Sequence, residues 1–122
     1  MSLADRILVA LAALAGLSGV ALSAAAAHAA GGANLETAAR FLMIHAAVLL
    51  GLMALAATGF VHPTAARLAA WALVLGLTLF AGDLVMRALK STALFPMAAP
   101  SGGILLMIGW GLIAIAAFLP RP

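Results

Sequence analysis

The sequence predicts an all-α membrane protein in which four transmembrane helices form an up-down-up-down bundle. Of its 122 residues, 67% are hydrophobic and only 7% are charged, whereas roughly 25% of the residues in a soluble domain are charged. Four stretches approach or exceed the roughly 20 apolar residues that a helix needs to cross a bilayer. They are apolar on every side, which is typical of helices in lipid and not of helices on a soluble surface.

We place the four spans at about residues 7–28, 41–61, 68–89 and 102–119. The second span carries no formal charge and a single imidazole, His45. The connections are short, so we expect one integral membrane domain over residues 1–122. The first span also resembles a secretory signal, but its apolar part exceeds the roughly 7–15 residues of a signal core, so we expect it to be retained.

Composition excludes several classes of function. The net charge of +3 comes from six basic residues that are scattered along the chain, so no basic patch indicates nucleic-acid binding. The absence of cysteine excludes disulfides, thiolate catalysis and iron–sulfur clusters. No complete catalytic motif is present, so we expect neither an enzyme nor a cofactor.

Small residues in the first span suggest close helix packing. Gly19, Ser23 and Ala27 recur at a spacing of four, which would place them on one ridge of the helix. An alanine-rich helix also produces such ridges by chance, and both interpretations stay open.

The fourth span is expected to open at Gly102 and Gly103, directly after Pro100 in the preceding connection, so that Pro100–Gly103 forms a turn at its start. Trp110 lies in the middle of this span, and a buried indole N–H needs a hydrogen-bond acceptor. We therefore expect Trp110 to face the bundle and not the lipid.

Antiparallel order predicts where the polar residues meet. The end of span one, the start of span two, the end of span three and the start of span four share one side of the bundle. This side receives a polar cluster that consists of His28, His45, Asp83 and Arg87. Asp83 and Arg87 are four residues apart, so they can neutralise one another on their own helix. The cluster is either a ligand pocket or a set of structural bonds between helices.

Four motifs, in order, resemble one known family. They are LSAAAAH at 22–28, TAARFLMIHAAVLL at 37–50, LFAGDL at 79–84 and PSGGILLMIGW at 100–110. The sequence is similar in these motifs to the small four-helix bacterial inner-membrane proteins grouped as domain of unknown function 423. The resemblance covers nearly the whole chain.

The resemblance implies a multi-pass protein of the bacterial inner membrane without an assigned activity. Basic residues are balanced between the two sides here, so the positive-inside rule gives no orientation. Relatives tend to be basic in the second loop and the tail, which implies cytoplasmic termini and a periplasmic polar cluster. His28 and His45 occupy matching positions, whereas Asp83 stands where the family usually has serine.

Three functions are compatible with these observations. The first is a structural or accessory role in the lipid bilayer or in a larger membrane protein complex, which small size and small-residue ridges favour. The second is binding or conduction of a small lipophilic molecule, an ion or a proton at the polar cluster. The third is a metal or haem site, for which the histidine and carboxylate spacing offers no local ligand motif, so we expect no metal.

Overall fold

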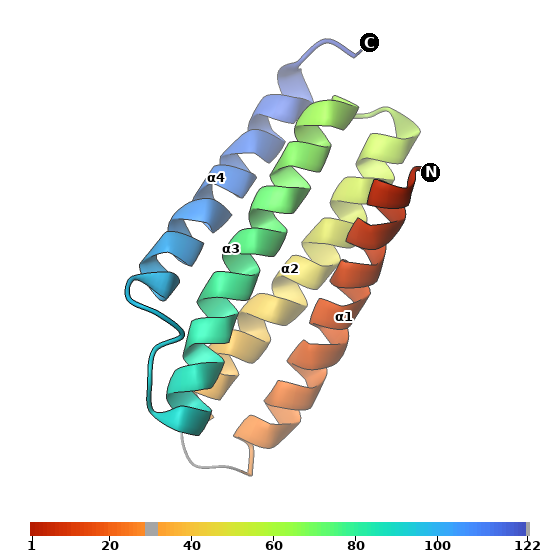
Figure 1. Ribbon diagram of the computed structural model, residues 1–122. Helices are drawn as coiled ribbons and strands as arrows, with labels where there is room; N and C mark the ends of the chain where they lie inside the picture. Colours follow the sequence, from red (N-terminus) through yellow and green to blue (C-terminus); the bar gives the residue numbers. More distant parts are fainter. Residues whose placement is uncertain (29–31, 122) are drawn as a thin grey trace.

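The computed structural model describes residues 1–28 and 32–121, which form four long α-helices. These are α1 (Leu3–Ala26), α2 (Gly32–Thr58), α3 (Pro63–Lys90) and α4 (Ala98–Phe118). Each helix is long and apolar enough to cross a membrane. The helices alternate in direction, so both termini lie at one end of the molecule (Figure 1). The prediction of an all-α, four-helix membrane protein is confirmed.

All four helices begin earlier than the predicted spans, and the difference is largest for α2. α2 begins at Gly32, nine residues before the predicted start, because the polar residues before Phe41 continue the helix. α4 begins at Ala98, with Pro100 in its first turn, where a missing N–H removes no bond within the helix. Pro100 therefore lies inside α4 and not in the connection, and no turn separates it from Gly102 and Gly103, which lie in α4 as the predicted span has them.

Side-chain caps fix the start of two helices at the same end of the molecule. Ser2 and Asp5 form a capping box on α1, in which Ser2 Oγ accepts from the Asp5 amide at 3.1 Å. His62 caps α3, and its Nδ1 accepts from the amide of Ala65 at 3.2 Å. Pro63 follows at the first position of α3, where its fixed φ suits the helix.

Neighbouring helices in the chain are also neighbours in space. α1 packs on α2, α2 on α3 and α3 on α4, while the contact between α1 and α3 is slight. Figure 1 shows this serial order across the molecule. The core is built largely from small side chains, since Ala66, Ala69 and Ala70 on α3 are fully buried. Small residues let helices in lipid approach closely, where packing replaces the hydrophobic effect as the attraction between them.

α3 and α4 touch backbone to backbone. A methyl group added to Gly76 would lie 2.7 Å from the carbonyl oxygen of Gly102 and 2.8 Å from the amide of Leu106. A methyl group on Gly102 would lie 2.6 Å from the amide of Phe80. Both positions therefore accept only glycine at this helix separation.

α1 approaches α2 closely at Gly19, which is buried. A methyl group there would meet the side chain of Met43 at 2.6 Å and the carbonyl oxygen of Ala39 at 3.1 Å. Ser23 and Ala27, the other members of the predicted ridge, are exposed. The buried face of α1 instead runs through Leu8 and Ala12 to Gly19.

Replacement of Gly76 by alanine is expected to push α3 and α4 apart. The added methyl group meets backbone atoms that cannot rotate away, so we expect a loss of about 1–3 kcal/mol in the free energy of unfolding. Gly111→Ala is the matched control on α4, because a methyl group at Gly111 meets nothing within 4 Å. Reversible unfolding in mixed micelles measures both variants. Equal stabilities for the two would contradict the close packing of α3 on α4.

Candidate functional site

His45 is a buried link between α2 and α4. Its Nε2 lies 3.2 Å from Nε1 of Trp110, and its Nδ1 lies 2.8 Å from the carbonyl oxygen of Phe41. An indole N–H can only donate, so Nε2 must be the acceptor and Nδ1 must carry the hydrogen that binds Phe41. Both ring nitrogens are thereby used, and neither is left for a ligand.

The aromatic surroundings of His45 join three helices. The ring of Phe41 stacks on His45 with centroids 5.8 Å apart, and it contacts Phe80 of α3 at 4.5 Å. Trp110 meets the imidazole edge on, at 5.9 Å between centroids. The indole N–H of Trp110 has the hydrogen-bond acceptor that was expected, but 45% of the residue is exposed, so its side chain is only partly turned toward the bundle.

Asp83 is fully buried and has two partners. Its Oδ2 accepts from Nε of Arg87 at 2.7 Å, the pair that the spacing of four predicts. Its Oδ1 accepts from the backbone amide of Leu94 at 2.9 Å. Leu94 lies in the connection between α3 and α4. No pattern in the sequence identifies which backbone amide of that connection donates to the buried carboxylate.

The predicted cluster does not form one open polar pocket. His28 is exposed in the turn that follows α1, while His45 and Asp83 belong to separate hydrogen-bonded groups. Among the described residues, no group of three or more His, Asp or Glu side chains could hold a metal ion. Over the same residues every buried side-chain nitrogen and oxygen has a hydrogen-bond partner. These polar groups therefore act as bonds between elements.

A further ion pair, which the sequence analysis missed, joins α1 to α3 near the termini. Arg67 donates to both carboxylate oxygens of Asp5, at 2.7 and 3.1 Å. At the same end, the guanidinium of Arg121 donates to the carbonyl of Gly59. Two features of the sequence could have indicated this pair: Asp5 and Arg67 have opposite charges, and antiparallel order places both at the same end of the bundle. The sequence does not show, however, that Asp5 lies on the face of α1 that points toward α3.

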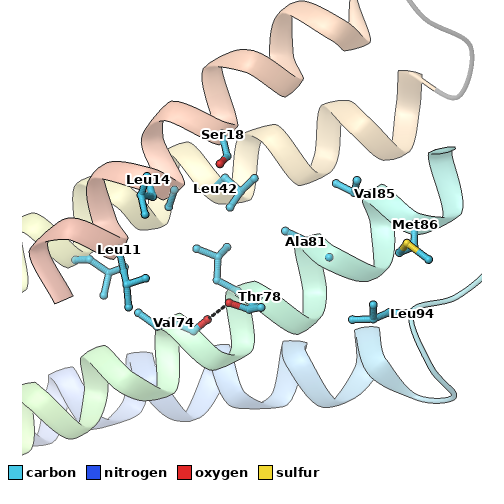
Figure 2. Close-up of a pocket in the computed structure, with 14 residues that line it drawn as sticks. Leu11, Leu14, Ser18, Leu42, Val74, Thr78, Ala81, Val85, Met86 and Leu94 are labelled. Atoms are coloured by element: carbon cyan, nitrogen blue, oxygen red, sulfur yellow. Dashed lines mark hydrogen bonds between the residues drawn. The ribbon is translucent and has the colours of Figure 1, made fainter. Parts of the chain in front are cut away.

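An apolar groove lies between α1 and α3, with α2 as its floor. Figure 2 shows its two walls and its length. The groove encloses about 450 Å³. Apolar residues dominate its lining, and the polar side chains are those of Ser18 and Thr78. The hydroxyl of Thr78 donates to the carbonyl of Val74 at 2.8 Å, which satisfies it within α3.

The groove follows one face of α3 for about half of the helix. Its α3 wall runs from Val74 to Met86, about 18 Å at 1.5 Å per residue. One leaflet of hydrocarbon is roughly 15 Å thick, half of a bilayer core. Val85, Met86 and Leu94 stand at the end near the α3–α4 connection, which we call the Met86 end (Figure 2). The length of the groove is thus comparable to the thickness of one leaflet.

Comparison with protein families gives one match. The family model described as "Protein of unknown function (DUF423)" matches residues 22–103, well over half of the chain. This confirms the resemblance that the four sequence motifs indicate. Neither a curated protein nor a solved structure matches the chain.

Trp110→Phe is expected to weaken the link between α2 and α4. Phenylalanine keeps an aromatic ring but leaves Nε2 of the buried His45 without its donor, so we expect a loss of about 1 kcal/mol in the free energy of unfolding. Trp71→Phe makes the same replacement on α3, where the described residues offer the indole N–H no hydrogen bond. Unfolding in mixed micelles compares the two variants. Equal effects would show that the hydrogen bond contributes nothing beyond ring packing.

Proposed function

The chain belongs to the family described as protein of unknown function (DUF423), and from this premise we propose an accessory membrane protein that binds a phospholipid and catalyses no reaction. The observation that carries the proposal is the apolar groove between α1 and α3. One acyl chain of the lipid lies in this groove. The phosphate of the lipid lies at the membrane surface beyond the Met86 end.

The position and size of the groove support an acyl chain as its occupant. The groove is lined by helices that are long and apolar enough to cross a membrane, so hydrocarbon surrounds it. Its length of about 18 Å suits a chain that extends through one leaflet. An acyl chain gains no hydrophobic energy when it moves from lipid to protein, so its retention depends on packing in the groove and on contacts of the headgroup.

Lys90 supplies the contact for the headgroup. It is the last residue of α3, is exposed, and follows Met86 by four residues, so the two lie on the same face of the helix. A lysine at the membrane surface attracts an anionic lipid by about 1 kcal/mol. The lining of the groove and the charge of Lys90 together favour a phospholipid over a neutral hydrocarbon.

The resemblance to bacterial inner-membrane proteins supports the location. With cytoplasmic termini, the Met86 end of the groove faces the periplasm, and the bound lipid belongs to the outer leaflet of the inner membrane. The conduction of an ion or proton through His28, His45 and Asp83 has less support, because His45 and Asp83 already use their polar atoms within the protein.

A protein partner in a larger membrane complex is the second candidate. α4 packs mainly on α3 and leaves a row of large apolar side chains exposed on its outer face: Ile104, Met107, Ile108, Ile115 and Phe118. Such a face suits either lipid or a neighbouring transmembrane helix. The two candidates are compatible, since the groove and this face lie on different helices.

Thr78→Phe is expected to fill the groove and displace the lipid. Thr78 lines the groove, so a phenyl ring there occupies the space of several methylene groups. We expect the bound fraction of phospholipid to fall about tenfold, because the acyl chain can no longer pack in the groove. Leu75→Phe is the control, because Leu75 is exposed on the same helix outside the groove. Native mass spectrometry of each protein, extracted in its own lipids, measures one retained phospholipid per chain.

Two results would contradict lipid binding in the groove. One is a parent protein that carries only a broad distribution of bulk lipids, without a preferred single mass. The other is equal retention by the Thr78 and Leu75 variants. A stoichiometric protein companion in the same spectra would support the role in a complex.

A further inference from the structure

The connection between α3 and α4, residues 91–97, passes beside the Met86 end of the groove. Leu94 in this connection forms part of the groove lining. A methyl group built on Gly82 would lie 3.5 Å from Cδ2 of Leu94, an ordinary van der Waals distance, so the leucine packs directly over this glycine. Figure 2 shows Leu94 close to Met86 at this end.

The same residue is anchored by its backbone. The amide of Leu94 donates to Oδ1 of Asp83, while Oδ2 of Asp83 accepts from Arg87. Asp83 is fully buried, and its pairing with Arg87 fixes the carboxylate on the helix. A single side chain of α3 thus determines where Leu94 stands at the groove.

Local backbone preference does not hold the connection in this path. Ser91 and Met97, at its two ends, both adopt left-handed conformations, with φ of 57° and 66°. Residues other than glycine seldom adopt them. Among the described residues, two hydrogen bonds tie the middle of the connection to helices: the Leu94 amide donates to Asp83 of α3, and the Phe95 carbonyl accepts from the amide of Ala98 at the start of α4.

We infer that Asp83 is a positioning residue that holds Leu94 as a gate at the Met86 end of the groove, where the lipid headgroup lies. This inference rests on the proposed function. The gate controls how fast a bound phospholipid leaves, because the Leu94 side chain covers the acyl chain where it enters the groove. The carboxylate suits this position because its two oxygens accept from Arg87 and from Leu94 at the same time.

The experiment measures the release of deuterated dioleoyl phosphatidylglycerol from the full chain in nanodiscs, after addition of excess unlabelled lipid, by native mass spectrometry over time. Leu94→Ala removes the gate side chain and leaves its backbone bond. We expect release about fourfold faster, because the acyl chain loses several van der Waals contacts with the Leu94 side chain. Phe95→Ala is the matched control, since Phe95 is exposed in the same connection and does not line the groove.

Two substitutions of Asp83 separate positioning from general stability. Asp83→Asn keeps an oxygen that can accept from the Leu94 amide, so release should stay close to the parent rate. Asp83→Ala removes the acceptor, and we expect release about as fast as in Leu94→Ala. If Asp83→Ala fails to fold, the comparison of Leu94→Ala with Phe95→Ala still tests the gate itself.

The outcomes distinguish the gate from the groove. Parent-like release by Leu94→Ala, in a protein whose Thr78→Phe variant loses the lipid, overturns the gate and leaves the proposed function intact. A parent protein that retains no lipid overturns both. Fast release by Leu94→Ala and Asp83→Ala, with slow release by Asp83→Asn and Phe95→Ala, supports the gate.

Discussion

The direct contact between the backbones of α3 and α4 is the constraint on which the remaining structure depends. Where Gly76 meets Gly102, no side chain separates the two helices. α3 therefore packs on α4 with one side and on α2 with another. α1 packs closely on α2 at Gly19 and has only slight contact with α3. The apolar groove is what this unequal packing leaves between α1 and α3.

Three hydrogen-bonded groups of polar side chains outside the groove stabilise this arrangement. Asp5 and Arg67 join α1 to α3, His45 and Trp110 join α2 to α4, and Asp83 holds the α3–α4 connection through Leu94. Such bonds are valuable within a membrane because an unpaired polar group there has no water to bind. Since each of these groups is bonded within the protein, the groove keeps a surface suited to hydrocarbon.

The sequence predicts the fold more completely than the site, for a physical reason. Length and hydropathy suffice to place four spans, and antiparallel order suffices to place the termini together. The spacing of four predicts the Asp83–Arg87 pair, and the chemistry of indole predicts a partner for Trp110. The sequence does not show which side of each helix faces its neighbours, because the spans are apolar on all sides and have little hydrophobic periodicity. The groove, the Asp5–Arg67 pair and the separation of His45 from Asp83 all depend on that facing.

The most direct test of lipid binding uses a phospholipid with a photoreactive diazirine near the end of one acyl chain. After irradiation in a bilayer, peptide mass spectrometry locates the labelled residues. The account predicts labels concentrated in the deep part of the groove, on Leu11, Leu14 and Val74. Equally dense labelling of Ile104, Met107 and Ile108 on the outer face of α4 would contradict it. Such a result would mean that bulk lipid surrounds the protein without a preferred site.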